Sequence, residues 1–278
     1  MKEIKSFHSG VEKMKLVEFD NLLDFYNYIN DTPYNKTFAD KHDKSSQRHD
    51  YKGWSGTKTY GEAIELFKSG WTVGAQDLTR KLKLAETDKQ VQAVAKNVLS
   101  MCGYQAIVPL YLNGVPNNMM NKKMVPVKQK VITINKALSA SSAVSSQTLM
   151  NESIKCFQII KKIESTGIRV NLNLMISTGH VMIKIRLKSS TEKVNVSKLA
   201  FPLVHVAMFR RLYFKFIEVY PTIPGSYRYG YGRVPSEDEF RKACEKGEVL
   251  LPTLLKCDTE KELKTLTVDE LISKFGAK

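Results

Sequence analysis

The sequence has 278 residues, of which 42% are hydrophobic and 26% charged, and its formal net charge is +15 at pH 7. This composition is that of an ordinary globular protein and excludes large-scale disorder. No apolar run reaches the roughly 18 to 20 residues that a membrane span needs, and the first ten residues lack the apolar stretch of a secretory signal. We therefore expect a cytoplasmic protein without membrane contact.

The positive charge is concentrated in the middle of the chain. Residues 1–88 hold 14 basic and 14 acidic side chains, and residues 234–278 hold 8 basic and 10 acidic ones. Residues 89–233 hold 21 basic side chains against only four glutamates. A polycationic segment between nearly neutral flanks is typical of proteins that bind a polyanion.

The amino-terminal third is predicted to be mainly helical, with a long polar loop over residues 30–58. The predicted helices cover residues 17–29, 60–69, 75–84 and 89–101. Thr59 and Glu62 have the spacing of a capping box, and Gly70 is placed to end the helix that follows them. We expect Trp54 and Trp71, which bracket this helix, to pack against it.

Strands dominate after residue 103, separated by two long helices. Strands are predicted over residues 105–112, 127–134, 168–176, 181–188 and 249–255, and residues 116–126 are predicted to be irregular. Helices are predicted over residues 146–165, 201–219, 236–246 and 268–275. The second is apolar on most sides and should be buried, with Pro202 tolerated in its first turn. Ser236 and Glu239 form another capping box.

These elements predict an α+β or α/β protein. We expect a helical amino-terminal region (residues 1–103), a basic α/β core (residues 104–235) and a carboxy-terminal helical extension (residues 236–278). The core should contain a mixed, largely antiparallel sheet with helices packed on one face.

The predicted hairpin over residues 168–188 alternates between two chemistries, because successive strand residues point to opposite faces. One face is apolar and should join the core. The other face shows four cations, Arg169, Lys184, Arg186 and Lys188, which we call the cationic face. Lys128 and Lys130 extend it if the preceding strand pairs nearby. Phosphates of a nucleic acid would relieve the mutual repulsion of these cations, although lysines also keep exposed sheets soluble.

The segment SYRYGYGRV, residues 226–234, is a second candidate for nucleic-acid contact. Its aromatic and basic residues are Tyr227, Arg228, Tyr229, Tyr231 and Arg233. Tyrosine rings stack on unpaired bases while guanidinium groups hold phosphates. The alternative is an ordered loop whose tyrosines pack on the domain.

Enzyme and metal signatures are missing from the sequence. There is no phosphate loop, dinucleotide fingerprint, nucleophile elbow or His-Glu-x-x-His motif. The serine-rich loop over residues 139–146 faintly resembles the Asp-x-Ser-x-Ser metal site of von Willebrand A domains, but the aspartate is absent. The four cysteines form no Cys-x-x-Cys pair, and Cys156 falls on the apolar stripe of a helix, as expected of a buried reduced thiol. We predict no cofactor, metal or catalytic residue.

Three groups of residues resemble a known pattern: Trp54-x-Gly56, Tyr60-x-Glu62-Ala63, Leu66 and Gly70-Trp71-x-x-Gly74; then Pro109-x-Tyr111-Leu112-x-Gly114-x-Pro116-x-x-Met119; then Glu164-x-x-Gly167-x-Arg169-Val170. This pattern, which spans most of residues 54–188, is similar to that of an uncharacterised family encoded by bacteriophages and related mobile elements. The resemblance implies such a setting and no mechanism. We call the first group the Trp box.

The sequence therefore predicts a non-catalytic nucleic-acid-binding protein that acts in replication, packaging or transcription of a phage. A structural or assembly protein of the virion, or an inhibitor that binds a host defence protein, are the alternatives that the residues leave open. In the first case the partner is DNA or RNA, and in the others it is a phage or host protein.

Overall fold

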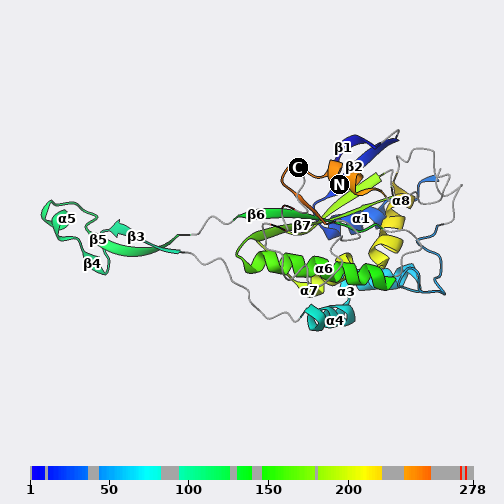
Figure 1. Cartoon of the computed structure of the whole chain (residues 1–278), viewed down its shortest axis with the longest axis horizontal. Coiled ribbons are helices and arrows are strands. Elements are labelled where there is room, and N and C mark those ends of the chain that lie inside the picture. The colour runs from blue at the N-terminus through cyan, green and yellow to red at the C-terminus, as the bar shows by residue number, and fades with distance from the viewer. Residues whose placement is uncertain are drawn as a thin grey trace.

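The computed structural model describes residues 2–9, 12–36, 44–82, 94–125, 130–139, 146–178, 181–220 and 235–251, with residues 270 and 273. Helices and two sheets form an α+β fold, which confirms the predicted class (Figure 1). Within these ranges, no helix is both long and apolar enough to cross a membrane.

Six strands form a mixed main sheet in the order β1-β2-β8-β7-β6-β9. They are β1 (Lys2–Ser9), β2 (Glu12–Phe19), β6 (Val131–Ala137), β7 (Arg169–Ser177), β8 (Val181–Lys188) and β9 (Val249–Leu251). The pairs β1–β2 and β7–β8 are antiparallel, whereas β2–β8, β6–β7 and β6–β9 are parallel. Strands from the start, middle and end of the chain thus share one sheet.

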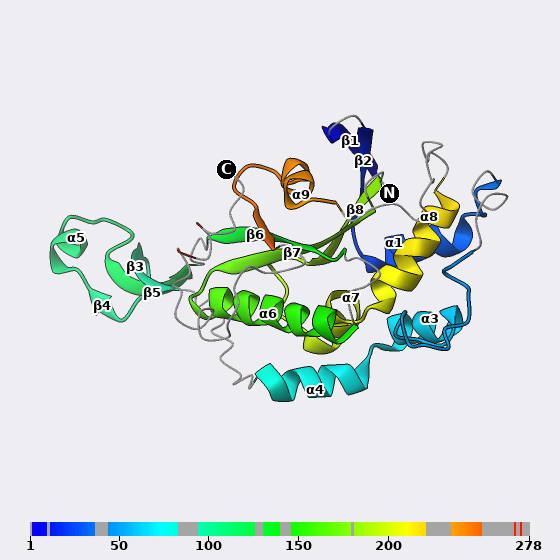
Figure 2. The ribbon, with the colours of Figure 1, turned by 45° about the vertical axis from the view of Figure 1, so that its right-hand side comes forward.

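Helices cover one face of this sheet in two layers (Figure 2). This first face is the one on which Leu172 and Leu174 of β7 lie. The inner layer holds α1 (Leu22–Asp31), α6 (Ser146–Ser165), α7 (Val196–Val204), the π-helix η1 (Met208–Tyr213) and α8 (Phe214–Val219). The outer layer, α3 (Tyr60–Ser69) and α4 (Thr72–Leu82), packs on α7 and η1. Because it lies between the sheet and the outer layer, the segment from Leu199 to Tyr220 is buried throughout.

The main core lies between the sheet and the inner helices. Leu172, Leu174 and Ile176 of β7 contribute to it together with the alternate residues of β8, as the hairpin pattern predicted. Cys156 of α6 is fully buried there, and burial raises the pKa of its thiol to about 11. The thiol therefore stays protonated and packs as a small apolar group.

A short helix covers part of the second face. The predicted capping box at Ser236 is present and begins α9 (Glu237–Ala243). Phe240 and Ala243 of α9 pack on an apolar cluster of strand residues that includes Met175 and Met182. Helices therefore pack on both faces of the sheet, whereas the sequence predicted them on one.

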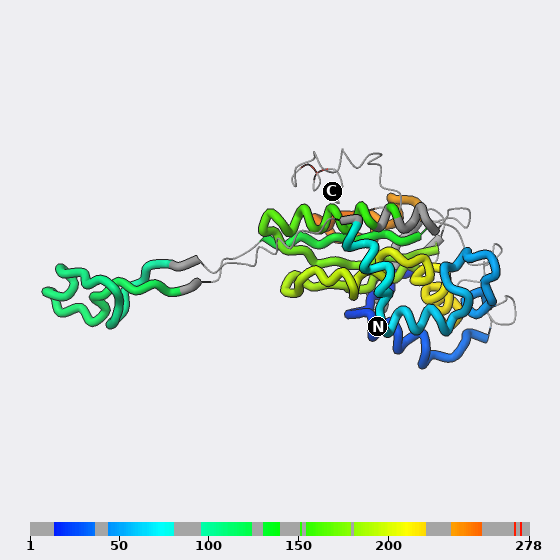
Figure 3. Tube along the Cα trace, turned by 90° about the horizontal axis from the view of Figure 1, so that it is seen from below, coloured from blue at the N-terminus to red at the C-terminus, as the bar shows by residue number. Residues whose placement is uncertain are grey.

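The second sheet is small and antiparallel, with strand order β3-β5-β4. Its strands are β3 (Val94–Ser100), β4 (Gln105–Ala106) and β5 (Met119–Val125), and the short helix α5 (Val108–Leu112) follows β4. Figures 1 and 3 show this unit extending away from the main sheet along the long axis of the molecule. We call residues 94–125 the projecting sheet.

The helix predicted over residues 17–29 is wrong in its first part. Its beginning belongs to β2, and α1 starts only after Asn21, whose side chain accepts a hydrogen bond from the backbone N–H of Asp24. The spacing of the apolar residues of β2 is compatible with both the helical period of 3.6 residues and the strand period of 2 residues. Pairing with the buried strand β8 decides in favour of a strand.

The predictions for residues 94–125 are also mostly wrong. Within the helix predicted over 89–101, the described residues 94–100 form β3. The irregular segment 116–126 contains β5, and the strand over 105–112 is β4 followed by α5. Pro109 favours the helix start because its ring fixes φ and it lacks an N–H. This unit is largely exposed, so burial imposes no clear period on its sequence.

The single helix predicted over residues 201–219 is three helical segments. Pro202 lies inside α7, where it removes the hydrogen bond to the carbonyl of Lys198, and α7 ends two residues later. His205 adopts an extended conformation before the chain turns into η1. The predicted burial is confirmed, whereas the continuity is not.

Buried charged residues of η1 and α8 hold the polar loop before α3. Arg211 Nη1 donates to the carbonyl oxygen of Ser46 at 2.8 Å, and Arg211 Nη2 donates to those of Thr57 and Lys58 at 2.8 and 3.0 Å. Glu218 accepts from Ser46 N–H at 2.9 Å and from Ser46 Oγ at 2.5 Å. These contacts order a loop whose residues include buried Ser46 and Thr57.

The Trp box forms part of this packing. The Trp71 ring meets His205 edge to face at 4.8 Å, and the guanidinium carbon of Arg210 lies 4.5 Å from the Trp54 ring centroid. A Cβ on Gly74 would lie 2.1 Å from the Trp71 indole, and one on Gly56 would lie 2.5 Å from Val206. Gly56 also has φ of +75°. Gly56 thus permits close packing on the turn between α7 and η1, and Gly74 permits close packing of the Trp71 indole.

Candidate nucleic-acid interface

Carboxylates from both flanks neutralise the predicted cationic face. Lys184 of β8 is only 12% exposed in its side chain, and its Nζ lies 3.4 Å from Glu248 Oε1 and 3.7 Å from Glu18 Oε1. Glu18 is its register partner on β2, so the two side chains share a face. Sequence distance between these residues concealed the pairing.

Arg186 is exposed but also has an acidic partner. Its Nε donates to the carbonyl oxygen of Asp20 at 3.0 Å, and its Nη2 lies 3.3 Å from Asp20 Oδ1. Both side chains are more than half exposed, so solvent screens this pair strongly.

Lys188 does not lie on the cationic face. Leu172 pairs with Lys188 while Asn173 pairs with Arg186, so Leu187 is the extra residue of a β-bulge. The bulge turns Lys188 to the core side, where its Nζ lies 2.7 Å from Glu164 Oε1 and donates to the Val170 carbonyl at 3.0 Å. The simple alternation used for the prediction fails at this residue.

A buried polar network occupies the middle of the cationic face, the sheet face that α9 partly covers. Asn173 donates to Asn135 Oδ1 at 2.9 Å, and Asn135 Nδ2 donates to Glu248 Oε2 at 2.7 Å. Cys244 lies beside Asn135 at 3.4 Å, and burial together with the Glu248 charge raises the pKa of its thiol to about 11. The network joins α9 and its following turn to the sheet, and its thiol is protonated near neutral pH.

Lys130 and Arg169, two further predicted contact residues, differ from the ion-paired cations described above. Lys130 is exposed, Arg169 is half-buried, and the Arg169 N–H donates to the Lys130 carbonyl at 2.9 Å. Neither side chain forms an ion pair with a carboxylate of the described ranges. Both lie at the start of their strands. Lys128 and the candidate residues Tyr227, Arg228, Tyr229, Tyr231 and Arg233 lie outside the described residues.

The projecting sheet carries cations that the sequence interpretation missed. Lys96 and Lys123 are register partners on β3 and β5, so they lie side by side, while Lys122 is opposite Asn97 on the other face. All three lysines are exposed. Residues 94–125 contain no aspartate or glutamate. The absence of acidic residues in this stretch was the available signal.

Exposed aromatic rings accompany these lysines. Tyr104 is 56% exposed, its hydroxyl donates to Asn97 Oδ1 at 3.2 Å, and Lys122 Nζ lies 5.5 Å from its ring centroid. Tyr111 of α5 is 66% exposed. Rings and ammonium groups on one exposed unit combine surfaces for base stacking with charges for phosphates.

The described residues contain no group of three or more His, Cys, Asp or Glu side chains placed to hold a metal ion. The serine-rich loop compared with von Willebrand A domains lies largely outside the described ranges. His205 is buried, its Nδ1 accepts from the Ala207 N–H at 3.2 Å, and its ring stacks on Phe201. These contacts give the imidazole a structural role.

A family model described as a domain of unknown function (DUF7192) matches residues 4–277. No curated protein and no solved structure matches the chain.

Proposed function

Because the chain belongs to the DUF7192 family, whose description names no activity, we propose its function from its residues: non-catalytic binding of nucleic acid, with the projecting sheet as the principal contact. The observation that carries this proposal is the pairing of Lys96 with Lys123 in a unit that has no carboxylate. Like charges placed opposite each other on a strand pair repel. A bound polyanion removes this repulsion and releases its own counterions.

The aromatic residues favour single strands as the partner. Tyr104 and Tyr111 are exposed on the same unit as the lysines, and unpaired bases stack on such rings whatever their sequence. Lys130 and Arg169, which lack ion pairs with described carboxylates, would extend the contact towards the main sheet. Lys128 and the tyrosines and arginines of residues 226–234 remain proposed contacts.

The cationic face contributes less than its sequence implied. Lys184 and Lys188 hold carboxylates inside the fold, so changing them tests folding as much as binding. The binding proposal is therefore better tested on the projecting sheet. A phage or mobile-element setting, in which such a protein would assist replication, packaging or transcription, is part of this proposal.

The test compares two triple variants in binding of fluorescent single- and double-stranded oligonucleotides. Lys96→Gln, Lys122→Gln and Lys123→Gln together should weaken single-strand binding at low salt. They should also flatten the slope of log K against log salt by about 2, because each lost phosphate contact contributes about 0.7 for single strands. Lys52→Gln, Lys193→Gln and Lys246→Gln remove three exposed charges from the main body and serve as the control.

Equal binding by the two triple variants would refute the projecting sheet as the contact. No binding by the unaltered protein at low salt would refute the function itself. Tyr111→Ala tests base stacking separately from charge. Loss of this stacking ring should cost about 1 to 3 kcal/mol in the free energy of single-strand binding.

A virion structural or assembly role is the second candidate, and one observation favours it. Val108, Leu112, Leu99 and Met101 of the projecting sheet are about half exposed or more, and exposed apolar side chains gathered on one unit are typical of protein interfaces. Val108→Ser with Leu112→Ser, which adds no charge, should then abolish incorporation into particles and leave oligonucleotide binding intact. Presence of the unaltered protein in purified virions at a defined stoichiometry is the matching measurement.

A further inference from the structure

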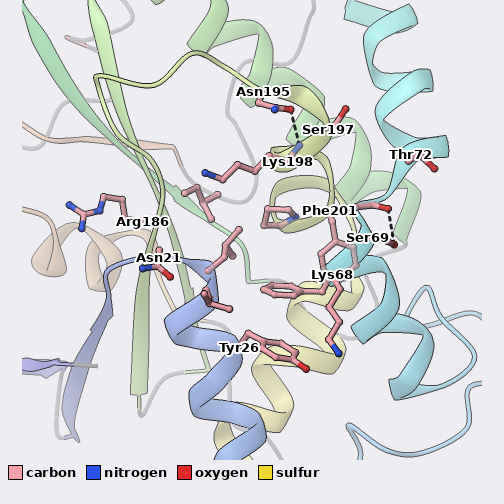
Figure 4. Close-up of a pocket in the computed structure, with 16 residues that line it drawn as sticks. Asn21, Tyr26, Lys68, Ser69, Thr72, Arg186, Asn195, Ser197, Lys198 and Phe201 are labelled. Carbon is pink, nitrogen blue, oxygen red and sulfur yellow. Dashed lines mark hydrogen bonds between the residues drawn. The ribbon is translucent and has the colours of Figure 1, made fainter.

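A pocket of about 790 Å³ opens between the amino-terminal part of α1, the end of α3, the starts of α4 and α7, and β8 (Figure 4). This volume lies within the range of small-molecule sites in proteins. It is separate from the projecting sheet, so its role is independent of the proposed nucleic-acid contact.

The walls of the pocket are largely apolar. Phe201 and Pro202 of α7, Leu22 and Leu23 of α1 and Phe67 of α3 line it. The Tyr26 and Phe67 rings stack, with centroids 5.5 Å apart and planes 16° apart. Such a surface accepts the flat or aliphatic body of a ligand through burial of apolar area.

The charged side chains among the described lining residues are all cations. They are Lys68, Arg186 and Lys198. Figure 4 shows Lys198 reaching towards the side on which Arg186 and Asn21 lie, whereas Lys68 and Tyr26 lie at the other end. In this view the Arg186 side chain extends away from Lys198, so the Lys198 ammonium group is the positive charge that faces this end of the pocket.

The existing partner of Lys198 is displaceable. Lys198 Nζ lies 3.7 Å from Glu192 Oε1, and both side chains are about half exposed. Solvent-screened ion pairs of this kind are weak, so an anion held against an apolar wall competes with them.

We propose that this pocket binds a small amphipathic anion, a molecule with one carboxylate, sulfonate or phosphate group and an aromatic or aliphatic body. The acidic group lies beside Lys198, and the body packs on Phe201 and the α1 leucines. The shape and the apolar walls disfavour a bare phosphate chain, which would leave the apolar area in contact with water.

The experiment uses two fluorescent probes that differ only in charge. 1-Anilinonaphthalene-8-sulfonate carries the acidic group, and N-phenyl-1-naphthylamine is the same ring system without it. The sulfonate should bind the full chain saturably and more tightly than the neutral probe. Lys198→Gln should weaken sulfonate binding about fivefold, as expected for loss of a partly exposed charge pair, and leave the neutral probe unchanged.

A second pair of variants separates the pocket from nonspecific dye binding. Leu23 is 62% exposed and lines the pocket, whereas Val73 is 72% exposed on α4 and is not among the lining residues. Leu23→Glu should reduce sulfonate binding about tenfold or more, because it places a like charge on the apolar wall, and Val73→Glu should not. Absence of saturable sulfonate binding, or equal effects of the two glutamates, would overturn the proposal.

Discussion

Lys188 Nζ lies 2.7 Å from Glu164 Oε1, and the side chains of the two residues are 2% and 13% exposed. The pair joins the end of β8 to the end of α6, two elements that are next to the main core. It exists because the bulge at Leu187 turns the lysine inward.

Removing one partner of this pair should destabilise the protein. Lys188→Met leaves the Glu164 carboxylate without its buried counter-charge, at a cost of about 3 kcal/mol in the free energy of unfolding. Adding Glu164→Leu should restore much of the loss. Urea unfolding of the single and double variants measures the coupling, and Lys198→Met, whose ion pair is half exposed, should change stability by less than about 1 kcal/mol. Equal effects of the two lysine variants would contradict the inward position of Lys188.

Arg211 should be irreplaceable by lysine. Its guanidinium group donates to carbonyls of Ser46, Thr57 and Lys58, and a single ammonium group lacks that planar fork. Arg211→Lys should cost about 2 to 3 kcal/mol through unsatisfied buried groups. It should also speed chymotrypsin cleavage at Tyr51, which is 88% exposed on the loop. Arg186→Lys is the control. Similar cleavage rates in both variants would contradict the role of the Arg211 hydrogen bonds in ordering the loop.

Acid should destabilise the protein through His205. Burial lowers the pKa of its imidazole from 6.5 to about 4, and the charge of Glu62 opposes this only in part. Between these two values the unfolded chain binds a proton that the folded chain does not, so the free energy of unfolding falls as the pH falls from 6.5 to about 4. His205→Asn keeps an acceptor for Ala207 N–H without titrating. The variant should lose this part of the pH dependence in urea unfolding between pH 7 and 4; an unchanged profile would exclude His205 as its source.

Two helical glycines should respond oppositely to alanine. Gly74→Ala places a methyl group within the Trp71 indole and should cost about 1 to 3 kcal/mol. Gly61→Ala in α3 meets only the Thr59 hydroxyl at 3.8 Å, so it should be neutral or stabilise by up to about 1 kcal/mol. Thermal unfolding of both variants measures the difference, and a stabilised Gly74→Ala would show that the indole moves freely.

Local signals predicted many of the elements well. Thr59 and Ser236 begin helices at the expected residues because each hydroxyl accepts from the backbone N–H three positions later. The helix over residues 146–165 and the hairpin over 168–188 were strongly periodic because the apolar residues on one side of each pack into the main core. Predictions failed where little was buried, as in β3 and β5, or where burial was complete, as between Leu199 and Tyr220, because neither environment selects a period.

The candidate interface was harder to predict because charges counted along the chain do not show which charges meet in space. Glu18 and Glu248, from the two flanks, meet Lys184 across the sheet, and no local pattern in the sequence reports that contact. Lys188 was misplaced by a single bulge residue. Lys96, Lys122 and Lys123 were recognisable in principle, since no acidic residue stands near them in sequence. Their exposure on a separate sheet required the fold.

The π-helix η1 sets the rotational phase of everything that follows it. Its wider turn accommodates one residue more than an α-helical turn does. Arg211 and Glu218, which lie about two helical turns apart, both contact Ser46. Deleting one residue between Arg211 and Glu218 would rotate Glu218 by about 100° relative to Arg211 and so away from the loop. Relatives of this chain should therefore have no insertion or deletion between Arg211 and Glu218. Alignments of the family can use that interval as a segment of constant length.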